Sequence, residues 1–285
     1  MSNFFSDVAH FTILQYAFGA AVLSSVACGT VGSFVTVKRI TYIAGAIAHC
    51  VLGGMGVARY LQRVHGLDAA SPMAGAVVSG LLSAMIIGFI TMRWKEREDT
   101  VLSALWATGM AIGILFISQT PGYSEDLMSY LFGNILMVSG TDLILVACLD
   151  VIIVVLCILF FNKLLTVCFD EEFARLRGIR VEIYYQILLC VTALTVVLLI
   201  QVVGIVMVIA LLTIPAATAS LFTRRLHHTI LLAIFLSLVF TLSGLIVSYE
   251  RNLPSGAVII VIAAGAYLLV LAGSRCRKML FQKPE

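Results

Sequence analysis

Apolar residues in this chain come in long, nearly unbroken runs that are separated by short polar segments. The runs, of roughly 18 to 25 residues, are long enough to cross a hydrocarbon core of about 30 Å as helices. They lack two-residue alternation, and lipid offers backbone groups no water partners, so the pattern predicts helices rather than a barrel. The predicted spans are Thr12–Val37, Thr41–Leu61, Pro72–Met92, Thr100–Ser118, Thr141–Phe161, Ile183–Val203, Ile205–Phe222, Thr229–Tyr249 and Ser255–Ser274.

Two of these runs leave the number of crossings open. Almost no loop separates the runs on either side of Gly204, and Pro215 interrupts the second, so one of them is a full span or a half-helix. Hydrophobic residues make up 61% of the chain and charged residues 12%, which leaves no room for a separate soluble domain. We therefore predict an all-α polytopic membrane protein, a bundle of eight or nine transmembrane helices that forms a single domain over residues 1–285.

Small residues are concentrated in several spans, as in Ala17–Gly32 and Gly109–Gly113. Small side chains let helices approach one another closely in lipid, so these segments predict a packed bundle rather than isolated anchors. The seven cysteines fall mostly inside apolar runs without close pairing, which is typical of buried small hydrophobic residues.

Lysine and arginine predict the orientation of the chain. With nine spans and an external amino terminus, all but three of the 18 lysines and arginines fall on one side, the exceptions being Arg59, Arg63 and Arg251. Such a bias marks the cytoplasmic side and places the carboxyl terminus there. Because the bases lie at helix ends rather than on one soluble face, the net charge of +3 does not indicate a nucleic-acid partner. The start, Met1–His10, lacks the features of a cleaved signal, so the first run is expected to be a retained span.

The longest external segment is expected to be Gln119–Gly140. Its middle, Asp126–Leu136, is apolar but too short to span a bilayer, which predicts a helix lying in the membrane interface.

The most strongly charged stretch is Cys168–Glu182, which lies between two apolar runs on the predicted cytoplasmic side. Acidic residues come first, basic residues follow, and Gly178 supplies a stop, as in a short helix. Phe173 and Leu176 lie three residues apart on one face. We expect a partner outside the membrane to act on this segment.

Few ionisable residues lie inside the spans, where each carries a free-energy cost unless paired or hydrated. His49 is either a ligand for a passing transition metal or a histidine hydrogen-bonded to a neighbouring helix. Asp150 is either a second ligand, a proton site or a structural partner. Glu250, on the external side, either guides a cation inward or is solvated surface charge.

No metal-ligand cluster with strong spacing occurs, which fits a path that must release its cargo. No phosphate-binding loop of the Gly-x-x-x-x-Gly-Lys-Ser/Thr kind is present either, so ATP hydrolysis would require another chain. The sequence therefore predicts a transport subunit rather than an enzyme.

Five segments, in order, carry a resemblance to a known family. They read KRITYIAGAIAH at Lys38–His49, YLFGNIL at Tyr130–Leu136, FDEEFARLRGI at Phe169–Ile179, VGIVMVIALLTIPAATA at Val203–Ala219 and SYERNLPSGA at Ser248–Ala257. The chain resembles, over nearly its whole length, the membrane permeases of ABC importers for zinc, manganese or iron, known as the ABC-3 family.

The resemblance implies a role for each part of the charged stretch. Its segment from Asp170, with Glu172, Ala174 and Gly178 in an E-x-A-x-x-x-G-like pattern, corresponds to the coupling helix that docks into a cytoplasmic ATPase. The implied assembly is a homodimer of this chain in the bacterial inner membrane, with two ATPase chains and an external metal-binding protein. The divalent metal is cargo, no cofactor is held permanently, and ATP is used by the partner.

One position departs from the family pattern. Many members carry an aspartate four residues before the histidine, one helical turn away, whereas this chain has Gly45 there. Asp150 or Glu250 would have to supply the missing ligand. Two rival functions remain at this point: a permease for larger metal chelates such as siderophore or haem, and an ATP-independent metal-proton exchanger that uses Asp150.

Overall fold

The computed structural model describes residues 10–67, 69–94, 98–121, 133, 135, 138–251 and 253–281. All regular elements in these ranges are helical. They are α2 (Thr12–Lys38), α3 (Thr41–His65), α4 (Pro72–Phe89), the π-helix η1 (Ile90–Trp94), α5 (Glu98–Ser118), α7 (Gly140–Leu159), α8 (Phe161–Phe169), α9 (Glu171–Leu176), α10 (Val181–Val203), α11 (Ile205–Phe222), α12 (Leu226–Arg251) and α13 (Ser255–Phe281).

Within the described ranges, nine helices are long and apolar enough to cross a membrane. They include both α10 and α11, so the structure favours nine crossings over eight. Gly204 alone separates these two helices, with φ 81° and ψ 163°, a conformation open to glycine and strained for other residues. Pro215 lies inside α11 without ending it, as proline does in membrane helices whose freed carbonyl is sheltered by neighbours.

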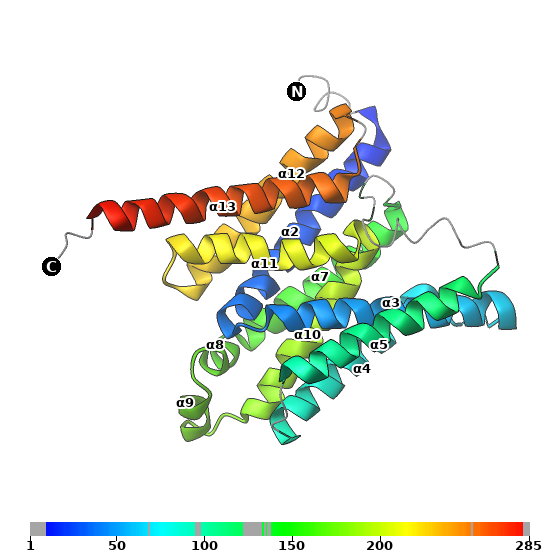
Figure 1. The fold of residues 1–285 in the computed structure, drawn as a ribbon, viewed down its shortest axis with the longest axis horizontal. Coiled ribbons are helices and arrows are strands. Elements are labelled where there is room, and N and C mark those ends of the chain that lie inside the picture. Colours follow the sequence, from blue (N-terminus) through cyan, green and yellow to red (C-terminus); the bar gives the residue numbers. More distant parts are fainter. Residues whose placement is uncertain are drawn as a thin grey trace.

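Helix α3 packs between α4 and α5 through glycines (Figure 1). A Cβ atom at Gly53 would lie 2.7 Å from the carbonyl oxygen of Gly109, and one at Gly56 would lie 2.7 Å from that of Gly113. On the other side, a Cβ at Gly54 would meet the Gly75 carbonyl oxygen at 2.4 Å. These backbones approach more closely than any side chain would permit, which confirms the packed bundle expected from the small residues.

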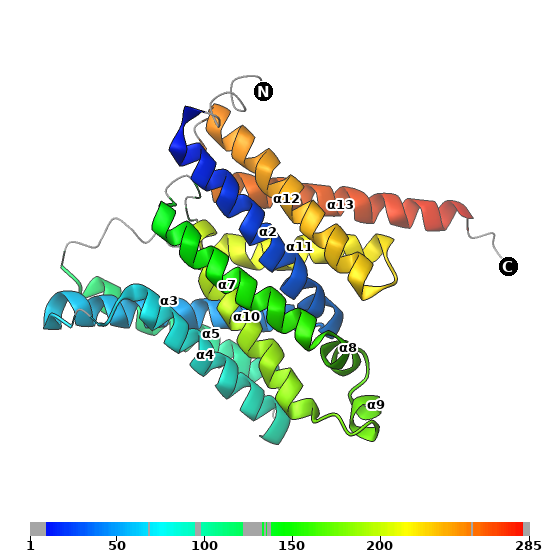
Figure 2. The same ribbon diagram turned by 180° about the vertical axis from the view of Figure 1, so that it is seen from behind.

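Helix α2 forms the centre of the other half of the bundle, between α12 and α7 (Figure 2). It also contacts α11, where the Cα of Gly32 faces the backbone of Leu212. The outermost spans are α5 and α13, of whose most apolar windows only 17% is buried. The buried core therefore lies along α2, α3 and α10, and the polar groups on these helices are the ones held in fixed positions.

Local sequence explains several helix starts. Ser71 caps α4 by accepting from the backbone N–H of Ala74, with Pro72 at the first helical position. Ser139 and Asp142 form a reciprocal capping box at the start of α7. The interfacial helix expected at Asp126–Leu136 lies almost entirely outside the described residues.

Replacing Gly32 by alanine should destabilise the bundle, because the new Cβ would lie 2.0 Å from the carbonyl oxygen of Leu212, and overpacking of this kind costs about 1–3 kcal/mol. The expected result is a melting temperature several degrees lower in detergent, measured by size-exclusion chromatography after heating. Gly265→Ala is the matched control, since nothing lies within 4 Å of a Cβ at that helical position. Equal melting temperatures for the two variants would contradict the close contact of α2 with α11.

Candidate functional site

His49 lies in the membrane-spanning part of α3 and is half-buried. Its Nδ1 is 2.8 Å from the carbonyl oxygen of Gly45, one turn earlier. A carbonyl oxygen only accepts, so Nδ1 donates in this contact, and Nε2 is the ring nitrogen left for another partner. The histidine is hydrogen-bonded within its own helix and still presents the nitrogen that a metal would use.

Trp106 of α5 covers one face of this histidine. The two rings are stacked, with centroids 4.3 Å apart and planes at 28°. The same indole fills the space beside Gly45, where a Cβ would lie 3.2 Å from the Trp106 ring and 3.6 Å from the Cδ1 of Ile209. An aspartate at position 45 would therefore require the indole to shift. In this chain the Trp106 indole lies beside position 45, where the resemblance implies a carboxylate.

The surroundings of Gly45 connect α3 with α11. Thr41 lies one turn before Gly45 and Thr213 one turn after Ile209, and both line an open cavity of about 400 Å³ at the end of the bundle. Thr36, Arg39 and Tyr267 are the other polar residues that line it. We call the line from His49 through Gly45 to Thr41, with Ile209 and Thr213 facing it, the α3–α11 seam. Eight residues of helix place His49 about 12 Å along this seam from Thr41.

The other two predicted ligands lie elsewhere. Asp150 is in α7, which packs on α2, α8 and α10. The residue is 5% exposed, its Oδ1 has no hydrogen-bond partner among the described residues, and it lies near enough to the Cys28 thiol of α2 to interact electrostatically. Glu250 is exposed at the far end of α12. Nowhere in the described ranges do three histidine, cysteine, aspartate or glutamate side chains gather as a metal site would require.

The charged stretch folds as expected from its sequence. Asp170 is the N-cap of α9 and accepts a hydrogen bond of 2.9 Å from the backbone N–H of Phe173. Ala174 is fully buried, and Gly178 ends the helix with φ 74° in open space. Glu172 is exposed.

The end of α8 and helix α9 leave large apolar side chains uncovered, although neither helix is a candidate span. Leu176 and Phe173 of α9 are 87% and 46% exposed, Phe169 at the end of α8 is 65% exposed, and the guanidinium of Arg177 lies 4.9 Å from the Phe173 ring centre. Apolar groups ringed by charges are the composition of a protein docking surface. We call Phe169, Glu172, Phe173, Leu176 and Arg177 the α9 surface.

Lys38, at the end of α2, fastens this segment to the bundle. Its ammonium contacts the carboxylate of Glu171 and donates a hydrogen bond of 3.2 Å to the carbonyl oxygen of Val167 in α8. Nearby, burial raises the pKa of the Cys168 thiol to about 12, so this cysteine is protonated and unreactive at neutral pH. The sequence alone pointed neither to Lys38 nor to Trp106, because their partners lie far away along the chain.

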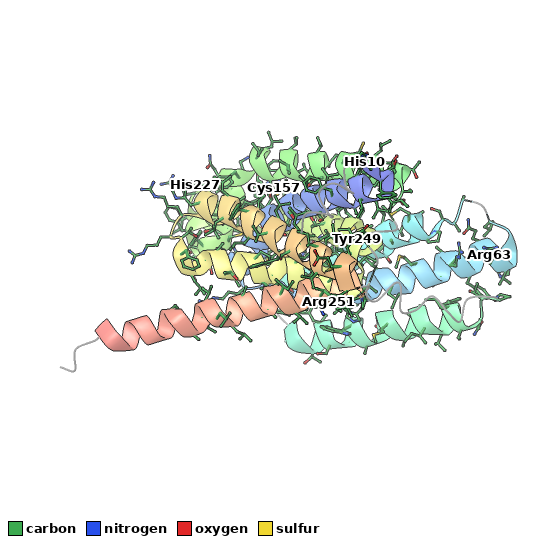
Figure 3. The ribbon with its side chains drawn as sticks, turned by 90° about the horizontal axis from the view of Figure 1, so that it is seen from above. His10, Arg63, Cys157, His227, Tyr249 and Arg251 are labelled. Carbon is green, nitrogen blue, oxygen red and sulfur yellow. The ribbon has the colours of Figure 1, made fainter. Side chains whose placement is uncertain are left out.

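Basic residues gather at one end of the bundle. Figure 3 shows His227, at the start of α12, on the opposite side of the bundle from Arg63, with Arg251 at the other end of α12. The end of α2 and helices α8 and α9 lie on the same side as the start of α12, whereas the start of α2 lies beside the end of α12 (Figures 1 and 2). The helix ends that the lysine and arginine bias assigns to opposite sides of the membrane thus lie on opposite sides of the folded bundle.

A helical bundle with a short exposed helix between spans fits the class formed by the membrane components of ABC-type transporters. The comparisons place the chain within it: the family model described as the ABC 3 transport family matches residues 10–274. The chain belongs to this family, which confirms the predicted all-α fold and the predicted family.

Relatives match over most of their length. A membrane protein of Synechocystis sp. is 42% identical, covering 93% of this chain and 92% of that protein. The manganese transport system membrane protein MntC of Halalkalibacterium halodurans is 34% identical, with 94% and 91% covered. The solved structure of PsaBC from Streptococcus pneumoniae in complex with Fab is 32% identical, with a TM-score of 0.83 and 94% of both chains covered.

The stacking of Trp106 on His49 provides an optical test for a metal at this histidine. The chain has two tryptophans, so in a Trp94→Phe background Trp106 is the only one left. Paramagnetic Mn²⁺ bound to Nε2 should quench its fluorescence in a saturable way, and a further His49→Ala change should remove the saturable part. His65→Ala is the control, because the His65 ring makes an edge-to-face contact with Tyr60 instead. Unchanged quenching in the His49→Ala protein would show that the ion binds elsewhere or only collides.

Proposed function

We propose that this chain is the membrane permease of an ATP-driven importer of divalent transition-metal ions such as manganese, working as a homodimer with a separate ATPase and an external metal-binding protein. Family membership and the manganese transport system relative support the substrate class. The observation that carries the proposal is the α9 surface, whose exposed Leu176 has no function in an isolated bundle.

The α9 surface fits an ATPase better than lipid. Its apolar groups alternate with Glu172 and Arg177, whereas a lipid-facing helix would carry no such charges at its centre. A protein cleft can cover Leu176 and Phe173 and pair the charges around them. Because positive charge marks the cytoplasmic end, α9 and the carboxyl terminus lie where ATP is available. Asp170, Ala174 and Gly178 then act by holding α9 in place, and Glu172 by direct contact.

The α3–α11 seam is the proposed path for the ion. It carries His49, two threonine hydroxyls and a cavity that opens at the basic end. Trp106 is 40% exposed and His49 half-buried, so in a single chain this polar seam would face hydrocarbon at a cost of several kcal/mol. A second copy seated on this face would enclose it. One imidazole per chain binds weakly, as release of the cargo requires.

The two remaining predicted ligands receive different roles. Glu250, at the end opposite α9, lies where ions would arrive from outside and would attract cations there. Asp150 lies against α2 rather than on the seam, and this favours a structural role over that of a second ligand to the ion at His49.

The rival functions receive less support. A chelate permease would need a path wide enough for a large ligand, whereas Trp106 narrows the seam beside His49. A metal-proton exchanger needs no ATPase, and the α9 surface would then have nothing to bind.

Two changes in α9 should weaken ATPase docking. Leu176→Gln removes an apolar anchor and should lower affinity at least about tenfold, the range of interface hot spots. Gly178→Val should do the same by straining a residue held at φ 74°, while Gly178→Asn, which tolerates this conformation, should not. Affinity is measured by binding of the partner ATPase to the permease in nanodiscs, with Arg224→Gln as a control at another turn. Full affinity in both Leu176→Gln and Gly178→Val would remove the docking assignment.

The function itself is tested by ion uptake into proteoliposomes that contain this chain and its partner ATPase, with Mn²⁺, Zn²⁺ and Fe²⁺ in turn. We expect uptake only with ATP, lowered about tenfold or more by His49→Ala. Asp150→Asn should leave uptake per folded protein near the original. Uptake driven by a proton gradient without ATP, and abolished by Asp150→Asn, would establish the exchanger instead.

A further inference from the structure

One ammonium group joins four helices at the basic end of the bundle. Lys38 is the last residue of α2, and its Nζ contacts the carboxylate of Glu171 in α9 and the Val167 carbonyl oxygen in α8. The ring centre of Tyr185, in α10, lies 5.9 Å away. The side chains of Lys38 and Glu171 are only 15% and 36% exposed, so solvent screens this ion pair less than it screens a surface pair.

The helix dipoles at the end of α8 and at the start of α9 favour the ion pair of Lys38 with Glu171. Val167 belongs to the last turn of α8, where carbonyl groups lack helical partners and the helix dipole is negative. Glu171 belongs to the first turn of α9, where the dipole favours a carboxylate. The ammonium therefore pairs with a carbonyl group at the end of α8 and with a carboxylate at the start of α9. Removal of the ammonium would take this partner from both groups. By contrast, the other ion pair of this segment, between Arg175 and Glu182, is 3.5 Å long and more than half exposed.

The backbone after Lys38 is a stiff corner. Arg39 adopts φ 63° and ψ 33°, its N–H bonds back to the carbonyl oxygen of Thr36, and the N–H of Ile40 bonds to that of Val35. Ile40 is buried and α3 starts at the next residue. With no loop to absorb motion, a displacement of Lys38 is passed to α3, on which Gly45 and His49 follow within about 12 Å.

Space for such a displacement exists next to the corner. A cavity of about 390 Å³ is lined by Lys38, Arg39, Tyr42, Thr91 and Glu171, among others. It separates the α2–α3 corner from the end of η1, so the corner can move on that side without displacing a packed side chain.

We propose that Lys38 is the positioning residue that transmits movement of α9 to α3, and so to the ion path. This inference rests on the proposed function, because it assumes that an ATPase moves α9. Through its bond to Glu171 the lysine makes α9, the α2–α3 corner and the first turns of α3 move as one body. The Phe173 and Leu176 side chains receive the partner, and Lys38 carries the displacement inward.

The test compares ions transported per ATP hydrolysed in proteoliposomes containing the complete complex and Mn²⁺. Lys38→Met keeps the aliphatic stem and Glu171→Gln keeps the shape, and each should lower this ratio about tenfold, within the usual range of coupling between sites. The double variant Lys38→Met/Glu171→Gln should be no worse than either single change. The conservative variant Lys38→Arg, which keeps a cationic donor between the end of α8 and the start of α9, should keep at least half of the ratio.

Matched controls are Lys163→Met and Glu182→Gln. Lys163 lies over the Tyr184 ring in the same region, and Glu182 pairs with Arg175 on the surface. Both should keep the original ratio. A purely structural role for Lys38 would lower uptake and hydrolysis together and leave the ratio unchanged, which would overturn the proposal.

Different results would contradict the proposed function and the role of Lys38. ATP-dependent uptake by the unaltered protein, with an unaltered ratio in Lys38→Met and Glu171→Gln, overturns the role of Lys38 alone. Uptake that needs no ATP overturns the proposed function and this inference with it. If the single variants do not assemble, Lys38→Arg decides, because it keeps the charge and its polarity at both helix ends: coupled uptake supports the proposal, and uncoupled uptake overturns it.

Discussion

The bundle depends on backbone-to-backbone contact at glycine. Lipid provides little hydrophobic drive for helices to associate, so packing must come from close approach. Gly53 and Gly56 of α3 meet the backbone of α5, and Gly54 meets that of α4. These contacts hold α3 firmly between α4 and α5, and His49 lies one turn before Gly53, where Trp106 of α5 stacks on it. The histidine of the proposed path therefore belongs to a helix that glycine contacts hold on two sides.

Much of the architecture could be predicted from the sequence, because a segment that crosses a bilayer must be apolar, helical and of a set length. All nine expected spans match the candidate spans within four residues at either end. The start and stop of α9 were also readable, since Asp170 and Gly178 act through local backbone geometry. The number of crossings was not, because a proline within an apolar run ends a helix in water and is tolerated by packed neighbours in a membrane.

The site was less predictable, and the reason is distance along the chain. Hydropathy identified His49 and Asp150 as isolated polar residues, but gave no information on whether they lie close together. In the structure α7, which carries Asp150, packs mainly on α2 and α10, whereas α3, which carries His49, packs mainly on α4 and α5. The stacking of Trp106 on His49 joins residues 57 positions apart, and the pairing of Lys38 with Glu171 joins residues 133 apart. A single sequence carries no signal for such pairs. The sequence did show that position 45 is a glycine rather than an aspartate, and the structure places the Trp106 indole beside this glycine.

The junction at Gly204 has a mechanical consequence. Helix α10 starts three residues after Gly178, and it meets α11 through one residue whose backbone lies against Gly133, where a Cβ would be 2.4 Å from the Gly204 nitrogen. Two rods joined at a fixed elbow behave as a bent lever rather than as a hinge. Tilting the end of α10 near α9 would then rotate α11, which lines the proposed ion path. Lengthening the junction by a few flexible residues would let the two helices move independently.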